Sequence, residues 1–102
     1  MILEVARLDV RLNELVEFEV AFQKASPLIA ATRGYISHEL QRCIETPNRY
    51  LLLVKWESLE AHTIGFRQSE QYQDWKMLLH HFYDPFPLVE HYEQLFQFGE
   101  KE

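Results

Sequence analysis

His62 is the side chain in this sequence best suited to acid–base chemistry. It follows Ser58, a residue type that begins helices, and it shares a predicted helical face with Leu59 and Phe66. Histidine changes its charge near neutral pH, so an imidazole on an apolar face is a candidate general base. A histidine packed on a sheet with a satisfied hydrogen bond is the alternative interpretation.

His38 is the second candidate for a catalytic residue. Alternating polarity in GYISHELQRC predicts a strand with Ile36, His38, Leu40 and Arg42 on one face. If that face looks towards the helices, His38 and His62 border one cavity. Otherwise His38 simply bonds to a neighbouring strand.

Aromatic residues and an arginine recur around His62 in the sequence and are the candidate lining of a substrate pocket. They are Trp56, Phe66, Arg67, Tyr72 and Trp75. Aromatic side chains at helical spacing are typical of a core and also of a pocket wall. The arginine is suited to binding an anionic oxygen, and a solvated ion pair is its alternative.

The other motifs of the sequence argue against several kinds of site. His80 and His81 are adjacent and point about 100° apart on a helix, which disfavours a two-histidine metal site. His91 is predicted to lie in the core or an interface. The sequence contains no HExxH, CxxC, phosphate-binding glycine loop or GxSxG elbow. A metal site, a nucleotide and serine-hydrolase chemistry are therefore disfavoured, and the single Cys43 forms no internal disulfide.

Composition sets the broad class of protein. A chain of 102 residues with 47% apolar residues predicts one globular domain over 1–102. A net charge of −6 without a basic stripe disfavours nucleic acid as a partner. No stretch approaches the roughly 18 apolar residues of a membrane span, so we expect no membrane association and a cytoplasmic protein.

Hydrophobic periodicity then gives the elements that must position these residues. A strand over 2–10 is followed by a helix capped by Asn13 that restarts at Pro27 and ends at Gly34. Two strands around the turn at 45–48 are predicted to form a hairpin whose second member is buried on both faces. Paired helices capped by Ser58 and Ser69 follow, then prolines and a strand over 88–98.

This order predicts an α+β fold of the ferredoxin-like, split βαβ type, with a four-stranded antiparallel sheet and helices on one face. The other face of the sheet still carries apolar side chains. A second copy of the same sheet is the most economical cover for it. We therefore expect a homodimer whose two sheets close into a barrel-like core.

The chain resembles the antibiotic biosynthesis monooxygenase family of the dimeric α+β barrel superfamily. The resemblance covers nearly the whole chain and is carried by GYISHELQRCIETPNRYLLLVKWESLEAHTIGFRQSEQYQDW and HHFYDPFPLVEHY. It implies a pocket between the sheet and the paired helices. In the oxygenases of the family it also implies chemistry without flavin or metal on a small aromatic phenol or quinol. His62 is our candidate for the base that such chemistry needs, because of its place on the apolar helical face.

Other branches of the family provide the alternative functions. The haem-degrading branch uses an asparagine, a tryptophan and a histidine at positions that here hold Ala6, Phe66 and a residue near Lys76. All three are missing, although His80, His81 or His91 remain as haem ligands for a haem-binding protein. A dimer that binds a small molecule without catalysis is the other alternative. We expect the protein to use no cofactor.

Overall fold

The structure is a computed structural model in which residues 1–100 are described, so the last two residues of the expected domain lie outside the described residues. In chain order the elements are strand β1 (Ile2–Asp9), 3-10 helix η1 (Leu12–Glu14), helix α1 (Leu15–Ala30), strands β2 (Tyr35–Arg42) and β3 (Arg49–Trp56), π-helix η2 (Ala61–Phe66), helix α2 (Glu70–Leu79), 3-10 helix η3 (His80–Phe82) and strand β4 (Val89–Tyr92).

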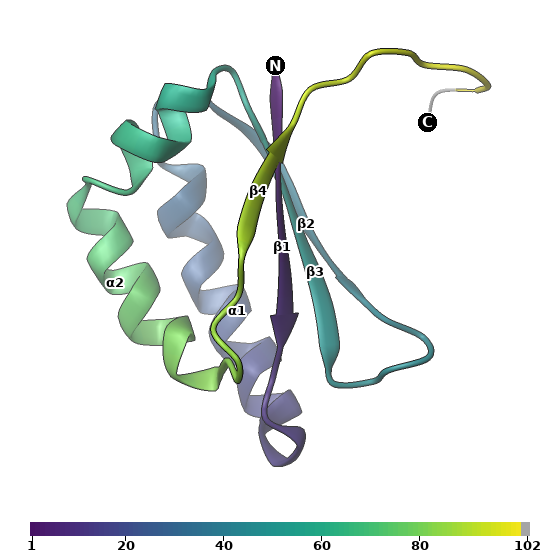
Figure 1. Ribbon diagram of the computed structural model, residues 1–102. Coiled ribbons are helices and arrows are strands. Elements are labelled where there is room, and N and C mark those ends of the chain that lie inside the picture. Colours follow the sequence, from purple (N-terminus) through teal and green to yellow (C-terminus); the bar gives the residue numbers. More distant parts are fainter. Residues whose placement is uncertain (101–102) are drawn as a thin grey trace.

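The four strands form one antiparallel sheet in the order β2-β3-β1-β4. Figure 1 shows α1 and α2 side by side on one face of this sheet. The arrangement is the ferredoxin-like α+β plan, which confirms the predicted fold class. Among residues 1–100, no helix has both the length and the apolar character needed to cross a membrane.

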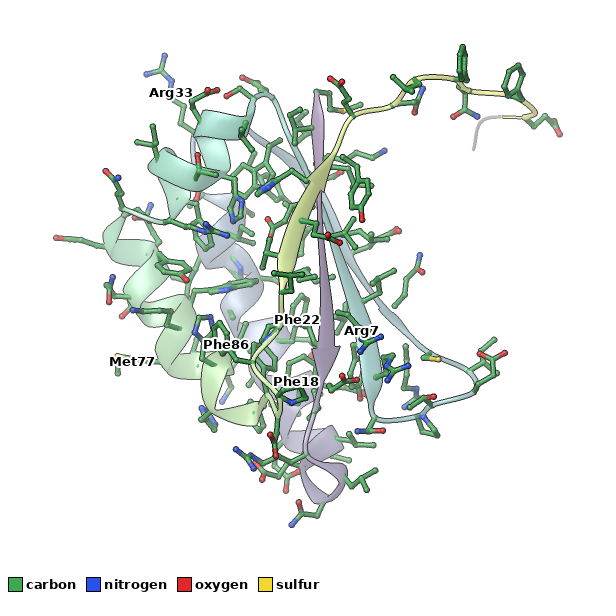
Figure 2. All side chains as sticks on the ribbon, in the orientation of Figure 1. Arg7, Phe18, Phe22, Arg33, Met77 and Phe86 are labelled. Atoms are coloured by element: carbon green, nitrogen blue, oxygen red, sulfur yellow. The ribbon has the colours of Figure 1, made fainter. Side chains whose placement is uncertain are left out.

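The core lies between the helices and the sheet. Phe18, Phe22, Ala25 and Ile29 form the buried stripe of α1, as the three- and four-residue spacing of the sequence predicts. Figure 2 shows Phe18 and Phe22 between α1 and the sheet, with Arg7 on the other side of the sheet. Successive residues of a strand point to opposite faces of the sheet. Because Arg7 of β1 lies on the outer face, Glu4, Ala6 and Leu8 lie on the helix side.

Helix α1 differs from its prediction at two points. Asn13 lies within η1 and is not the cap, since α1 begins at Leu15 after Glu14. The helix also runs through Pro27 without a restart. Proline removes one backbone hydrogen bond, here the one to the carbonyl of Gln23. Both residues are exposed, so water can replace the lost partner and the helix continues.

The start of β2 holds a bulge that changes which residues share a face. Tyr35 pairs with Trp56 and Ser37 pairs with Lys55, so one extra residue, Ile36, lies between two consecutive partners. Tyr35 thereby joins His38 on the helix side, and Ile36 is 44% exposed. The prediction that Ile36 shares a face with His38 was therefore wrong.

Strand β3 is buried on one face in the single chain. Tyr50, Leu52 and Val54 are buried towards the helices, whereas Leu51 and Leu53 are half-buried on the opposite side of the sheet. The predicted burial of both faces is not met within one chain.

Strand β4 is shorter than the predicted strand over 88–98. It spans Val89–Tyr92 and pairs with Leu3 to Ala6 of β1. The following residues run away from the body of the molecule on the side of the sheet opposite the helices (Figure 1). Beyond Tyr92 only the first residues of β1 remain as pairing partners, so the ladder ends there. Three exposed apolar residues lie on this tail: Leu95, Phe96 and Phe98.

The helix pair begins as predicted. The Ser58 hydroxyl accepts a hydrogen bond from the backbone of Ala61, and the Ser69 hydroxyl accepts one from Tyr72. The first member, however, is a π-helix rather than an α-helix, and Leu59 is 41% exposed instead of sharing the buried face of His62. A π-helix bonds i to i+5, so the face predicted from α-helical spacing is not the face observed.

Candidate functional site

A cavity of about 430 Å³ lies between the helix face of the sheet and α2. Its floor comes from β1 and β3, its roof from η2 and α2, and its rim from the residues before β4. The side chains that line it include Glu4, Leu8, Leu52, His62, Phe66, Arg67, Tyr72, Trp75, His80, Tyr83 and Phe86. The volume falls in the range of roughly 300–1,000 Å³ that is typical of small-molecule sites.

A buried carboxyl and a buried imidazole meet in the wall of this cavity. Glu4 and His62 are 5% and 3% exposed, and Glu4 Oε1 lies 3.4 Å from His62 Nε2. The indole of Trp56 donates a hydrogen bond of 2.9 Å to the same carboxyl oxygen and stacks on the His62 ring with centroids 5.3 Å apart. Trp56 is therefore the residue that orients both groups, although it does not itself line the cavity.

The other nitrogen of His62 faces the last strand. His62 Nδ1 lies 2.8 Å from His91 Nε2, a hydrogen bond in which either ring is able to be the donor. His91 stands directly opposite Glu4 in the pairing of β4 with β1. One rung of the sheet thus supplies two side chains, and His62 comes from the helix layer to contact both.

The π-helical turn sets the position of His62. The backbone N–H of Arg67 donates to the carbonyl of His62, five residues back, at 3.1 Å. Such turns occur often at functional sites. Within this turn His62 and Phe66 are both buried, and Arg67 follows at the mouth of the cavity. The turn therefore brings a titratable ring, an aromatic wall and a cation to one place.

The charge state of the pair follows from its burial. Burial raises the pKa of Glu4, against the opposing effects of the Trp56 hydrogen bond and the Arg67 charge. Burial, together with the smaller effects of the nearby Arg67 and His91, lowers the pKa of His62 to about 3. Both shifts favour the uncharged forms, and with a pKa of about 3 the His62 imidazole is neutral, so the contact is not an ion pair.

This result corrects one expectation from the sequence. With a pKa lowered to about 3, His62 is a weak base and does not titrate near neutrality. When Glu4 loses its proton, however, its negative charge favours protonation of His62. The two groups must therefore be treated as one coupled acid–base unit.

The predicted lining residues are largely brought together. Phe66, Arg67, Tyr72 and Trp75 all line the cavity that contains His62. The Phe66 ring makes edge contacts with Tyr72 and Trp75, with centroids 5.2 and 5.6 Å apart. Arg67 has no carboxylate within ion-pair distance among residues 1–100, so its charge faces the cavity mouth without a protein counterion.

His38 lies elsewhere, and the prediction of one cavity shared with His62 was wrong. It lines a separate groove of about 480 Å³ between α1 and β2. Tyr35 bonds to its Nδ1, and Ser26 Oγ lies 3.0 Å from its Nε2 while donating to the carbonyl of Phe22. Burial lowers the pKa of His38. Both ring nitrogens are satisfied within the protein, which is the arrangement of a packing histidine.

The remaining histidines divide between the cavity and the surface. His80 lines the cavity, where burial and then Lys76 lower its pKa, and His81 is exposed. Within residues 1–100, no three His, Cys, Asp or Glu side chains are grouped to hold a metal ion.

Sequence reasoning missed Glu4 and His91 as members of the site. A signal for Glu4 was present, because it occupies an inward position of the alternating pattern between Ile2 and Ala6. An acidic residue on an otherwise apolar strand face is unusual and indicates a paired or functional group. His91 could be found only once the pairing of β4 with β1 was known.

Comparison with known proteins shows the same fold and related sequences. The sequence model of the family described as antibiotic biosynthesis monooxygenase matches residues 1–77. The uncharacterized protein YczJ of Bacillus subtilis (strain 168) is 52% identical over 95 residues, which cover 93% of this chain and 100% of that protein.

Solved structures share the fold of this chain. A putative antibiotic biosynthesis monooxygenase from Bordetella bronchiseptica superposes with a TM-score of 0.89 at 35% identity, covering 93% of this chain and 97% of the other. SnoaB, a cofactor-independent oxygenase from Streptomyces nogalater, has a TM-score of 0.82 at 18% identity, covering 97% of each chain. At that identity the second likeness concerns the fold alone.

Proposed function

Because the chain belongs to the antibiotic biosynthesis monooxygenase family, we propose that it is a monooxygenase that oxidises a small aromatic phenol or quinol with O2 and uses no cofactor. The observation that carries the proposal is the coupled Glu4–His62 pair in the wall of an aromatic cavity of about 430 Å³. We treat residues 1–102 as one domain that contains this site.

The chemistry requires the substrate to supply the electrons that reduce O2. Removing a phenolic proton gives an electron-rich anion that can transfer electrons to O2 directly. One oxygen atom then enters the ring and the other leaves as water, with every electron drawn from the substrate. The protein must accept a proton, stabilise the anion and exclude water.

The residues of the site match these three requirements. The Glu4 carboxylate, backed by His62, accepts the phenolic proton and returns it when water is formed. Arg67, which has no protein counterion among the described residues, stabilises the substrate anion. The rings of Phe66, Tyr72 and Trp75 form apolar walls that hold an aromatic ring and displace water.

Oxygen consumption tests the proposal. Protein free of added metal and flavin is incubated with a panel of quinols and polyphenols in an oxygen electrode, with the autoxidation of each compound subtracted. We expect protein-dependent uptake that is reduced about 100-fold or more in both Glu4→Gln and His62→Ala. His81→Ala, which changes an exposed histidine outside the cavity, is the matched control and keeps full activity. Uptake that persists in Glu4→Gln and His62→Ala contradicts the assignment.

A binding role without catalysis is the second candidate function. The observation that favours it is the low pKa of His62, about 3, which makes this imidazole a poor base. This alternative predicts saturable quenching of Trp75 fluorescence by an aromatic ligand and no oxygen consumption across the whole panel.

We further propose that the functional unit is a homodimer. The sheet face opposite the helices carries the partly buried Leu3, Val5, Leu51 and Leu53, and the apolar tail after Tyr92 extends on that same side (Figure 1). Contiguous apolar surface of this kind marks a subunit interface. A second copy placed against this face would cover both the sheet and the tail.

A further inference from the structure

Three titratable side chains from three elements form one chain of contacts. Glu4 on β1 and His91 on β4 are paired directly across the sheet, so both project from the same face. His62 of η2 meets both of them: its Nε2 lies 3.4 Å from Glu4 Oε1, and its Nδ1 lies 2.8 Å from His91 Nε2. The chain runs from the cavity wall at Glu4 to the half-buried ring of His91.

This chain has two arrangements in which every contact joins a donor to an acceptor. In the first, the protonated Glu4 carboxyl faces the bare His62 Nε2 at 3.4 Å, and His62 Nδ1–H donates to His91 Nε2. In the second, His91 Nε2–H donates to His62 Nδ1, and His62 Nε2–H faces the Glu4 carboxylate. The two differ by one proton, which leaves to solvent from His91 Nδ1.

We propose that His91 is a positioning residue that sets the ionisation of Glu4 through His62, so that the three side chains titrate as one unit. The consequence for catalysis rests on the proposed function, because only the Glu4 carboxylate accepts a phenolic proton. The last strand of the fold thereby controls the acid–base state of a residue on the first strand.

The second carboxyl oxygen of Glu4 indicates that the cavity end of the three side chains is at Glu4 and the solvent end is at His91. Oε1 receives the indole of Trp56 and faces His62, whereas Oε2 makes no hydrogen bond within residues 1–100. Thr32 Oγ1 is the one buried side-chain oxygen or nitrogen without a partner in that part of the chain, so Oε2 is not sealed away from the cavity that Glu4 lines. Oε2 is therefore the oxygen of Glu4 that is available to a ligand in the cavity.

Other titratable and charged groups around Glu4, His62 and His91 affect the loss of the proton that these three side chains share. Arg67 at the cavity mouth favours the carboxylate form of Glu4 and the neutral forms of His62 and His91. Tyr83, whose pKa is raised by burial and by the neighbouring Glu4, stays a neutral phenol. His80 on the same cavity is held neutral by burial. These groups shift the pH at which the three side chains lose their shared proton.

The test needs no substrate. In protein labelled with ¹³C at glutamate carboxyls and ¹⁵N at histidine rings, a pH titration by NMR follows the ionisation of Glu4 and the tautomer of His62. The Glu4 signal is identified by its loss in Glu4→Gln. We expect the Glu4 carboxyl to ionise and the His62 ring to exchange its Nδ1–H form for its Nε2–H form at one shared pH midpoint.

Two replacements of His91 sharpen the test. His91→Phe removes both ring nitrogens and makes the surroundings of Glu4 less polar, which raises the Glu4 midpoint by about one pH unit or more. His91→Gln keeps a donor and an acceptor and restores the midpoint close to that of the wild type. His81→Phe is the matched control and leaves the midpoint unchanged.

Two results would overturn the inference: a His62 ring that keeps one tautomer while Glu4 ionises, or a Glu4 midpoint that His91→Phe does not move. Because the ¹⁵N label also reports His91, the wild-type titration decides the question even if His91→Phe does not fold: the His91 ring must lose its Nδ1–H at the shared midpoint. A shared midpoint in a protein that consumes no oxygen with any quinol would retain the coupled unit and reject the monooxygenase proposal, so the two failures are distinguishable.

Discussion

At the scale of single residues, the site depends on a carboxyl that is buried next to groups able to tune it. Trp56 donates a hydrogen bond to Glu4, and that bond opposes the effect of burial on its pKa. Trp56 is fully buried and stacks on His62, so its indole N–H has a fixed direction. Its contribution to the site is therefore electrostatic as well as steric.

Replacing Trp56 by Phe is expected to raise the pKa of Glu4. The change keeps an aromatic ring but removes the N–H that stabilises the carboxylate. The measurement is the pH titration of the Glu4 carboxyl by ¹³C NMR. Trp75→Phe is the control, since it changes another buried indole that does not bond to Glu4. An unchanged Glu4 midpoint in Trp56→Phe would show that this hydrogen bond does not affect the pKa of Glu4.

Sequence patterns predicted the buried position of His62 but not its low pKa. The position of His62 before Phe66 predicts a ring on a buried face, and the structure places it there. Its low pKa arises from Arg67 and His91 as well as from burial. His91 lies 29 residues away in the chain, so this neighbour depends on a tertiary contact that periodicity does not encode.

At the scale of elements, the turn between α1 and β2 controls the position of η2. Gly34 has a φ of +88°, and a Cβ added there would lie 2.6 Å from Cβ of Ala61, the first residue of η2. Both the backbone conformation and the lack of space require glycine at this position. The close approach brings β2 and the helix that carries His62 together.

Gly34→Ala is expected to destabilise the protein by about 1–3 kcal/mol, because a side chain at positive φ is strained and the added methyl displaces η2. Urea unfolding measures the change. Gly65→Ala is the matched control: a Cβ there meets its nearest neighbours at 3.8 and 3.9 Å, which is ordinary contact. Equal effects of the two substitutions would contradict the close approach at Gly34.

The elements themselves follow from the sequence more closely than their edges do. Period-two and helical patterns predicted four strands and the helices between them, because burial on one face imposes those periods. The bulge at Ile36 was not predicted, since one extra residue leaves the alternation of β2 intact on either side. Strand β4 was predicted too long because Leu95 and Phe96 continue the apolar pattern where no strand of the same chain lies opposite.

At the scale of the whole molecule, buried neutral histidines link stability to pH. The folded-state pKa of His62 is lowered to about 3, and those of His38, His80 and His91 are lowered as well. The unfolded chain therefore binds protons that the folded protein does not. The resulting stability is complete above the ordinary histidine pKa of 6.5 and is lost as the pH falls below it.

We expect the free energy of unfolding to fall between pH 6.5 and 4.5, by up to about 1.4 kcal/mol per pH unit from His62, with the other three histidines acting in the same direction. Glu4 acts in the opposite sense in this window, because its raised pKa keeps a proton bound in the folded protein. Urea titrations at several pH values measure the slope. His62→Phe should reduce the slope, whereas His81→Phe should leave it unchanged; equal slopes in all three proteins would contradict the prediction.

Association through the outer face of the sheet is the second prediction at this scale. We expect light scattering to give twice the chain mass of 12.3 kDa. Leu53→Glu places a charge on the apolar outer face and should yield a monomer, since burying an unpaired charge is costly. Leu12→Glu changes an exposed leucine of η1 and should leave the dimer intact. A monomeric wild-type protein would contradict the proposed interface.

The π-helical turn at η2 has a consequence for how such a pocket can be altered. Its i to i+5 bond from Arg67 to His62 accommodates one more residue than an α-helical turn between the same flanking segments would. Deleting a single residue from Ala61–Phe66 would let the segment close into an α-helix and rotate the ring of His62 away from Glu4. The length of this π-helical turn is thus, beside the identity of His62 within it, a variable through which an insertion or a deletion changes the pocket.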